Sequence, residues 1–252
     1  MSGQVRSRSF ASFDGAELVW HEMGEGRPAV LLHGLFSSAD MNWIRFGHAG
    51  TIAGAGFRVI MPDLRAHGKS AAPHDPVAYP PDVLARDGLA LIARLGLEDY
   101  DLGGYSLGGR TAVRMVVEGA RPRRLVVAGM GLEGLLDTGA RGRFFRRVLA
   151  GVGSHARGSE EWRAEAFLKT TGGDPEALLP LLDSFVDTTR AELEAIAVPT
   201  LVLAGEEDEE NGSQRALAEA LPDARFVAIP GTHMSAVTRP ALGEAIARFL
   251  AA

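Results

Sequence analysis

Short apolar runs alternate with longer stretches of helical periodicity along most of this chain. The runs after residue 28 are short, rich in β-branched residues and unbroken by polar ones. This pattern is typical of central strands in a parallel sheet, which are covered on both faces. The predicted strands are 18–20, 29–32, 58–61, 100–102, 125–128, 200–203 and 225–229.

Helical patterns lie between these runs. In the last of them Leu242, Ile246, Phe249 and Leu250 recur at helical spacing on one face. Regular alternation of strand and helix predicts a mostly parallel sheet with right-handed crossovers and helices on its faces, an α/β fold. The predicted helices are 81–95, 107–118, 214–221 and 240–250.

The alternation breaks once, between about 133 and 197, where no strand-like run occurs. Glycine-containing turn material at 151–158 and 172–175 separates segments that suit helices. We therefore predict a core domain made of 1–132 and 198–252, with a helical insertion at 133–197 before the last two strands. The helices expected in it are 141–149, 159–170, 175–186 and 188–197.

Composition narrows the class of protein. The 252 residues are 46% hydrophobic and 23% charged, which is ordinary for a soluble globular protein. The formal net charge of −6 disfavours a general surface for nucleic acid or anionic membrane. There is no cysteine, so disulfides and thiol catalysis are excluded.

No apolar leader stands at the N-terminus and no stretch reaches the roughly 18 apolar residues of a membrane span, so a cytoplasmic location is expected.

Residues Gly104-Tyr105-Ser106-Leu107-Gly108 carry the most specific chemistry in the chain. They read G-x-S-x-G between a predicted strand and a predicted helix, which is the pattern of a nucleophile elbow. Such a turn holds the serine in a sparsely allowed backbone conformation, and a Cβ at 104 or 108 is expected to collide with neighbouring backbone. The pentapeptide alone is weak, because a serine before a helix also suits an N-cap.

A serine hydroxyl needs a base within hydrogen-bond reach, and the base needs a carboxylate to hold it. Ser106, Asp208 and His233 each follow a predicted strand, in the order Ser, Asp, His. Carboxyl ends of parallel strands meet at one edge of a sheet, so the three side chains are expected to converge there. Asp208 lies within an acidic run, 206–210, that also suits a solvated loop; Glu207 and Glu209 are alternative acids.

Taken together, these motifs resemble the α/β-hydrolase superfamily, in its serine-nucleophile, esterase-like branch with a helical cap. The resemblance spans about 10–250 apart from the insertion. His33-Gly34 after a strand looks like the family's oxyanion loop, and 62–70 looks like its P-D-x-R-G-x-G-x-S segment, with Ala66 in place of a glycine. The glycine-rich H-G-G-G loop of one lipase and esterase branch is missing. The family spacing from Gly205 favours Asp208 as the acid; a second family arrangement would use Glu133 instead.

The elbow motif and the resemblance also imply an oxyanion hole made of backbone N–H groups. Leu107, directly after the serine, is the first expected donor, and Leu35 in the His33-Gly34 loop is the second, with Phe36 as its alternative. Phe36 and Tyr105 flank the site and are expected to contact substrate, as is Leu107. His33 and His67 are expected to brace the loop by hydrogen bonds.

The insertion would cover the site as a cap. Its apolar side chains can line an acyl or alcohol pocket, or simply seal the cap onto the core. A basic cluster in it suits either a solvated helix face or an anionic substrate group. The apolar residues are Phe144, Phe145, Val148, Leu149, Trp162, Phe167, Leu168, Leu178, Leu181, Leu182 and Phe185, and the basic cluster is Arg141, Arg143, Arg146 and Arg147.

These features predict a serine hydrolase that cleaves a small carboxylic ester through an acyl-enzyme, with no cofactor. The acidic run lacks histidines at metal-ligand spacing, so no metal is expected. The serine disfavours dehalogenases and epoxide hydrolases of this fold, which use aspartate at that position. A lactonase, thioesterase, C–C bond hydrolase or cofactor-free haloperoxidase or perhydrolase would share the triad, and a non-catalytic ligand receptor is the alternative of another class. Monomer and homodimer both remain open.

Overall fold

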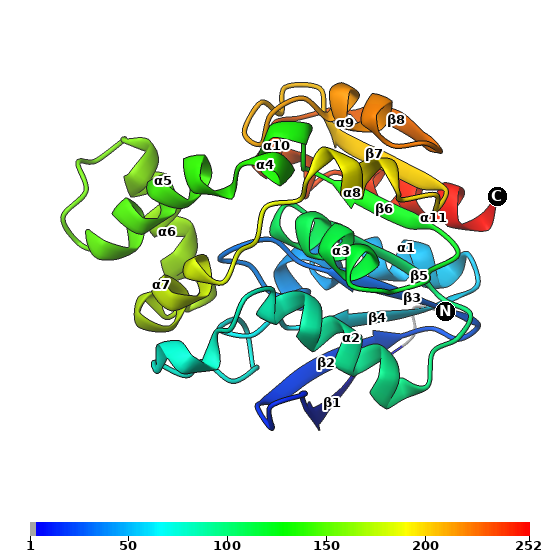
Figure 1. The fold of residues 1–252 in the computed structure, drawn as a ribbon, viewed down its shortest axis with the longest axis horizontal. Coiled ribbons are helices and arrows are strands. Elements are labelled where there is room, and N and C mark those ends of the chain that lie inside the picture. The colour runs from blue at the N-terminus through cyan, green and yellow to red at the C-terminus, as the bar shows by residue number, and fades with distance from the viewer. Residues whose placement is uncertain (1–3) are drawn as a thin grey trace.

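The computed structural model describes residues 4–252 and contains one eight-stranded sheet in the order β1-β2-β4-β3-β5-β6-β7-β8 (Figure 1). β1 pairs antiparallel with β2, and β2 pairs antiparallel with β4, whereas all later neighbours are parallel. The predicted, mostly parallel sheet is therefore confirmed. The strands are β1 (Arg6–Ala11), β2 (Glu17–Met23), β3 (Arg27–Leu32), β4 (Phe57–Pro62), β5 (Asp101–Tyr105), β6 (Leu125–Ala128), β7 (Thr200–Gly205) and β8 (Ala224–Ile229).

Helices cover both faces of this sheet because its central strands are apolar on both sides. Along β3, Val30 and Leu32 face one core while Ala29 and Leu31 face the other. The first core is closed by α2 (Val83–Leu95), α3 (Leu107–Val117) and α9 (Gln214–Ala220), and the second by α1 (His48–Gly54) and α11 (Pro240–Ala251). The remaining short elements are η1 (Asp40–Ile44), η2 (Pro76–Ala78) and α10 (His233–Ala236).

β1 was not expected from the sequence. Five of its six side chains are exposed and only Phe10 is buried, so no apolar run marks it. It is an edge strand, held by its ladder with β2. Short α1 was also missed, because only His48, Ala49 and Ile52 of its seven residues are buried.

Five helices lie between β6 and β7: α4 (Leu132–Leu136), α5 (Thr138–Ala150), α6 (Glu160–Thr171), α7 (Pro175–Asp183) and α8 (Arg190–Glu194). α5 packs against both α6 and α7, and the three form a lobe at the left of Figure 1. α4 and α8 instead contact α9 of the main body. The division into a core and a cap at 133–197 stays a prediction.

α8 is shorter than the predicted helix 188–197. It begins with a capping box, in which Thr189 accepts from the N–H of Glu192 and Glu192 accepts from the N–H of Thr189. It ends at Glu194, six residues before Thr200, and Pro199 cannot continue a helix. The chain then enters β7 directly.

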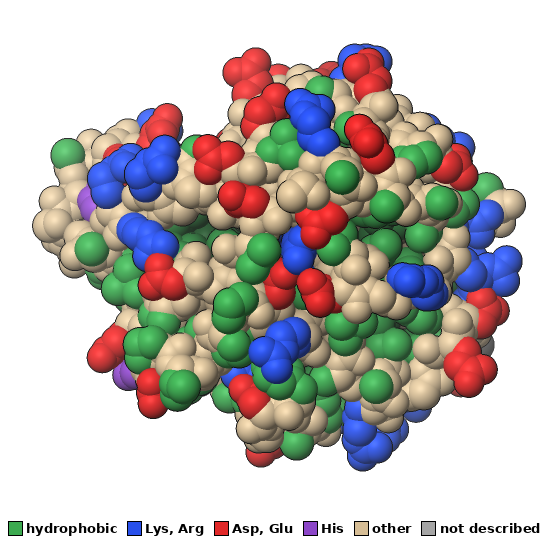
Figure 2. All heavy atoms as spheres, in the orientation of Figure 1, with side chains coloured by type: hydrophobic (Ala, Val, Ile, Leu, Met, Phe, Trp, Pro, Cys, Tyr) green, Lys and Arg blue, Asp and Glu red, His purple; other side chains and the backbone are tan. Residues whose placement is uncertain are grey.

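Charges of both signs are interspersed over the face drawn in Figure 2, with no extended field of one sign. Within 4–252 none of the helices combines the length and apolarity needed to cross a membrane.

Candidate active site

Ser106 occupies a strained turn between β5 and α3. Its backbone has φ 54° and ψ −116°, a region that residues with a Cβ rarely adopt, and its N–H donates to the Ala128 carbonyl across 2.7 Å. A Cβ on Gly104 would lie 2.2 Å from the carbonyl carbon of Gly108, and one on Gly108 would lie 2.1 Å from the carbonyl oxygen of Leu32. The predicted need for glycine at both positions is confirmed, and it fixes the elbow that presents Ser106.

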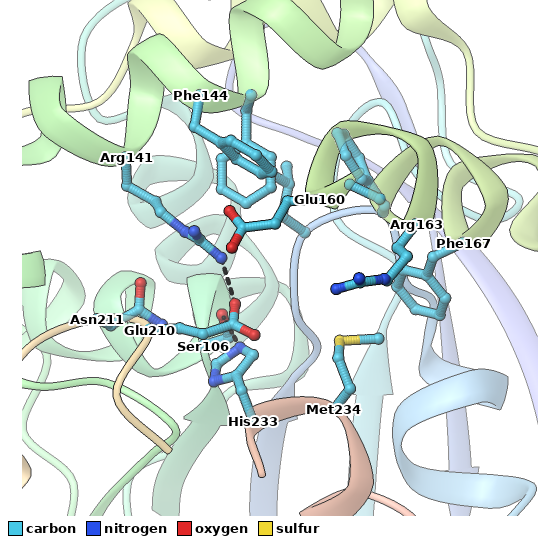
Figure 3. A pocket seen from close by; sticks show the side chains of 14 residues that line it. Ser106, Arg141, Phe144, Glu160, Arg163, Phe167, Glu210, Asn211, His233 and Met234 are labelled. Carbon is cyan, nitrogen blue, oxygen red and sulfur yellow. Dashed lines mark hydrogen bonds and ion pairs between the residues drawn. The ribbon is translucent and has the colours of Figure 1, made fainter. Parts of the chain in front are cut away.

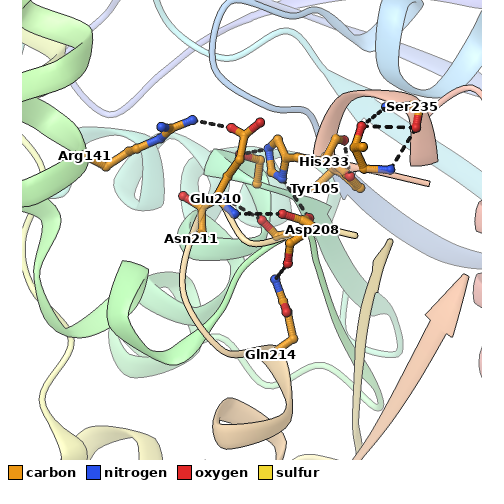
Figure 4. Close-up of polar contacts among 11 residues, drawn as sticks. Tyr105, Arg141, Asp208, Glu210, Asn211, Gln214, His233 and Ser235 are labelled. Carbon is orange, nitrogen blue, oxygen red and sulfur yellow. Dashed lines mark hydrogen bonds and ion pairs between the residues drawn. The ribbon is translucent and has the colours of Figure 1, made fainter. Parts of the chain in front are cut away.

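The structure brings Ser106, His233 and Asp208 together from three separate loops. Nε2 of His233 lies 3.0 Å from Oγ of Ser106 (Figure 3), and Nδ1 of His233 lies 2.8 Å from Oδ2 of Asp208 (Figure 4). A carboxylate can only accept, so Nδ1 carries the proton and Nε2 presents its lone pair to the hydroxyl. The imidazole is thus oriented to take a proton from Ser106.

Asp208 is itself held in place and buried, with 5% of its surface exposed. Its Oδ1 accepts from the N–H of Glu210 at 3.2 Å, and its carbonyl accepts from Nε2 of Gln214 at 3.1 Å. Glu207 and Glu209 are exposed, and Glu133 accepts from the N–H of Ser213 at 2.7 Å. Of the acids considered from the sequence, Asp208 is the one that meets His233.

The His33-Gly34 loop runs beside the elbow, since a Cβ on Gly34 would lie 3.5 Å from the Cβ of Ser106. The N–H of Gly34 donates to Oδ1 of Asn42 at 3.1 Å, and that of Phe36 donates to Nε2 of His67 at 3.2 Å. Within the described chain, the N–H groups of Leu35 and Leu107 have no acceptor. The alternative donor, Phe36, is therefore occupied, whereas Leu35 and Leu107 are free to bind an oxygen.

His33 and His67 brace this loop from beneath. Nδ1 of His33 donates to the Gly34 carbonyl at 2.8 Å while Nε2 accepts from the N–H of Leu64 at 3.0 Å. Nδ1 of His67 donates to the Arg65 carbonyl at 2.9 Å. Burial lowers the pKa of both histidines, that of His67 to about 3, so both rings are neutral and can accept at Nε2.

Three spaces border Ser106, and Leu35 lines all of them. The main cavity, of about 320 Å³, lies under α5 and α6 (Figure 3). A second chamber of about 160 Å³ lies between η1 and α10, and a third of about 50 Å³ lies between α3 and α5. The main cavity is lined by Leu35, Phe36, Ser106, Arg141, Phe144, Phe145, Glu160, Arg163, Ala164, Phe167, Glu210, Asn211, His233 and Met234.

The two predicted substrate contacts differ in position. Phe36 lines the main cavity and packs edge-on against Phe145, with ring centroids 5.4 Å apart. Tyr105 reaches only the second chamber and is 3% exposed. Its hydroxyl donates to the His233 carbonyl at 2.6 Å, so its polar end is bound to the His233 backbone.

Few of the cap residues considered from the sequence reach the site. Phe144, Phe145 and Phe167 line the main cavity and Phe185 lines the third chamber. Trp162 is exposed, and the other apolar cap residues are buried: Val148, Leu149, Leu168, Leu178, Leu181 and Leu182.

Of the basic cluster, Arg141 alone lines a cavity, and it pairs with Glu210. Arg146 pairs with Asp183 and Arg147 with Glu161 on the outer surface. The lining residues Glu160, Arg163 and Glu210 were missed, because nothing local distinguishes them from other exposed charges. Among residues 4–252 no cluster of three or more His, Asp or Glu side chains is suited to hold a metal ion.

Comparison with known proteins decides the family. Residues 29–243 match the model of the Alpha/beta hydrolase family. The AB hydrolase superfamily protein YisY of Bacillus subtilis is 30% identical over 212 residues, covering 74% of this chain and 76% of its own.

The chain belongs to the α/β-hydrolase family.

Two further members are similar over nearly the whole chain. The non-heme haloperoxidase of Rhodococcus erythropolis is 28% identical over 86% of this chain and 89% of its own length. A bromoperoxidase from Bacillus anthracis, known from its crystal structure, is 26% identical over 97% of this chain and 99% of its own, with a TM-score of 0.75. This α/β hydrolase thus has the fold and chain length of its relatives, two of which are named a haloperoxidase and a bromoperoxidase.

Proposed function

We propose that this α/β hydrolase cleaves small carboxylic esters through an acyl-enzyme, with Ser106 as nucleophile, His233 as general base and Asp208 as the acid that holds it. The observation that carries the proposal is the 3.0 Å contact between Oγ of Ser106 and Nε2 of His233, backed by Asp208 at 2.8 Å. The free N–H groups of Leu35 and Leu107, on either side of Ser106, support it further.

The reaction follows from these positions. As Oγ of Ser106 attacks the ester carbonyl, Nε2 of His233 takes its proton, and the adjacent Asp208 stabilises the imidazolium. The N–H groups of Leu35 and Leu107 donate to the developing oxyanion; a single such donor contributes about 3–4 kcal/mol to transition-state stabilisation. His233 then protonates the leaving alcohol. A water deprotonated by His233 releases the acid and restores Ser106.

Perhydrolase or cofactor-free haloperoxidase activity is the second candidate. The named haloperoxidase relative matches 86% of this chain and 89% of its own length, which favours this alternative over others. In such a reaction hydrogen peroxide would replace water as the acceptor of the acyl group on Ser106.

The proposal also includes three expectations drawn from the sequence. The substrate is a small molecule, the protein acts in the cytoplasm, and Phe36 contacts the substrate under a cap formed by 133–197. The mixed surface charges of Figure 2 offer no nucleic-acid footprint on that face.

Hydrolysis of p-nitrophenyl esters from acetate to palmitate tests the proposal, with Ser106→Ala alongside. We expect turnover of short esters by the wild type and a loss of at least about 10³-fold in kcat in the variant. Ser154→Ala, on the exposed surface of the cap, is the matched control and should retain full activity. Acyl transfer to hydrogen peroxide at the expense of hydrolysis would favour the second candidate, and a wild type inactive on every ester would contradict both.

A further inference from the structure

Arg110 is a buried cation without a carboxylate partner. It stands on α3, one helical turn after Ser106, and is 5% exposed. Among the described residues, its guanidinium makes one hydrogen bond, from Nη2 to the Val186 carbonyl, and its Nε is buried with no acceptor. Among residues 4–252 no carboxylate lies within ion-pair distance of it.

The nearest acids already serve other groups. Asp82 is bound by Arg114, with 2.6 Å between Oδ2 and Nη2, and Asp187 accepts from the N–H of Thr138 at 2.8 Å. Burial lowers the pKa of Arg110 to about 10, which still leaves it protonated at neutral pH. A buried charge that lacks a hydrogen-bonded counter-ion is costly, and a carboxylate supplied by a ligand would remove that cost.

Arg65 is a second buried arginine, and its charge is neutralised by carboxylates within the fold. It is fully buried, and Asp14 and Asp87 neutralise it at 2.6 and 2.8 Å. All five of its donors lie in a closed network with these acids and the Ala78 carbonyl. Arg110 has no such network. Its guanidinium lies over the Phe185 ring, 5.0 Å from the ring centroid, and donates to the Val186 carbonyl. The contrast with Arg65 indicates that the carboxylate for Arg110 comes from outside the chain.

Arg110 lines the third chamber together with Ser106, Leu107 and Arg141. No aspartate or glutamate lines this chamber, and Nε of Arg141 is also buried without an acceptor. Figure 3 shows Arg141 reaching from α5 toward Ser106, with one end of its guanidinium on Glu210. A space of about 50 Å³ suits a group of a few atoms, and two guanidinium forks suit a planar carboxylate.

The chamber lies on the acyl side of the scissile bond. His233 lines the main cavity and the second chamber, where it can protonate a leaving alcohol, but it does not line the third chamber. Of the two expected oxyanion donors, Leu35 lines all three spaces, whereas Leu107 lines only the third chamber among them. A group in it is therefore attached to the acyl carbon rather than to the alcohol.

We propose that Arg110, with Arg141, binds a carboxylate on the acyl part of the substrate, so that this hydrolase prefers monoesters of short dicarboxylic acids. The inference rests on the proposed ester hydrolysis. In the reaction, water and the monoester give the free dicarboxylate and the alcohol. Arg110 is a substrate-binding residue and takes no part in proton transfer.

Monomethyl glutarate and methyl 4-carbamoylbutanoate form the matched substrate pair, because they differ only in carboxylate against amide. With wild type in a pH-stat, we expect kcat/KM to be at least tenfold higher for the carboxylate. Arg110→Gln should reduce the ratio of the two kcat/KM values at least tenfold, and Arg110→Lys should restore part of it. Arg143→Gln, an exposed arginine on α5 that lines no chamber, is the control and should keep the wild-type ratio.

Binding of glutarate to Ser106→Ala by calorimetry tests the chamber without catalysis. Binding that is lost on adding Arg110→Gln supports the proposal, even if no ester is turned over and the proposed function fails. Two outcomes would overturn the inference while leaving ester hydrolysis in place. The first is Ser106-dependent hydrolysis with no preference for the carboxylate. The second is an Arg110→Gln variant that has a lower Tm and slows both esters equally, which would assign Arg110 a structural role.

Discussion

The N–H of Phe36 donates to Nε2 of His67 across 3.2 Å, and this contact decides which amide of the loop is free. Gly34 donates to Asn42, so Leu35 alone between them keeps an unused N–H beside Ser106. The hydrogen bond also requires His67 to be neutral. A second histidine, His33, holds the other end of the same loop.

Acid should destabilise this protein partly through His67. Burial lowers its folded pKa to about 3, against 6.5 for an ordinary histidine, so the unfolded chain takes up the proton first. Its contribution to stability is full above pH 6.5 and is lost as pH falls from there toward 3. The free energy of unfolding should fall by up to about 1.4 kcal/mol per pH unit from this one group.

Urea unfolding at several pH values between 7 and 4 measures this effect. His67→Gln, which keeps an acceptor for Phe36 but cannot titrate, should show a shallower slope than wild type. The pKa values of His33 and His48 are lowered by burial too, so a residual slope of the same sign is expected in the variant. Equal slopes in both proteins would contradict the assignment to His67.

Tyr105→Phe should lower both stability and kcat. The change removes the buried hydrogen bond to the His233 carbonyl, which costs about 1 kcal/mol of stability, and it leaves His233 less firmly positioned. We expect a severalfold lower kcat at unchanged KM. Tyr79→Phe is the matched control: its hydroxyl donates to the Pro73 carbonyl at 2.7 Å, away from the site, so stability should fall similarly while kcat stays constant.

Asp208→Asn should leave the fold intact and lower kcat by about 10⁴-fold. The amide can donate to Nδ1 of His233, which favours the wrong tautomer and removes the lone pair that faces Ser106. Glu209→Gln alters the same acidic loop at an exposed position and should have little effect. Comparable losses in the two variants would show that the loop's net charge, rather than Asp208, supports His233.

Gly108→Ala should destabilise the protein by about 3 kcal/mol or more, because the new Cβ would meet the Leu32 carbonyl at 2.1 Å, backbone that cannot move without disturbing β3. Gly50→Ala provides the comparison. Gly50 lies inside α1 with nothing within 4 Å of its would-be Cβ, so alanine there should stabilise by about 0.5–1 kcal/mol. Chemical denaturation of both variants measures the difference, and similar free energies of unfolding would refute the close-approach argument.

Local patterns were enough to predict most of the sheet and the elbow. The continuous apolar runs predicted seven of the strands, and G-x-S-x-G placed Ser106 at a strand-to-helix turn. The order of Ser106, Asp208 and His233 at strand ends predicted that they meet, because the carboxyl ends of parallel strands share one edge. The edge strand β1 was not predicted, because few side chains of an edge strand are buried and its sequence therefore contains no apolar run.

By itself, the sequence determined the fold and the convergence of Ser106, His233 and an acid of the 206–210 run, because backbone periodicity and strand order are encoded over short spans. Only the tertiary structure decided that Asp208 rather than its acidic neighbours meets His233, and that Leu35 rather than Phe36 keeps a free N–H. It alone showed Arg110 without a carboxylate partner among residues 4–252, since even its acceptor, the Val186 carbonyl, lies 76 residues away. Contacts between distant segments determine which polar groups find a hydrogen-bond partner, and a local sequence pattern does not predict these contacts.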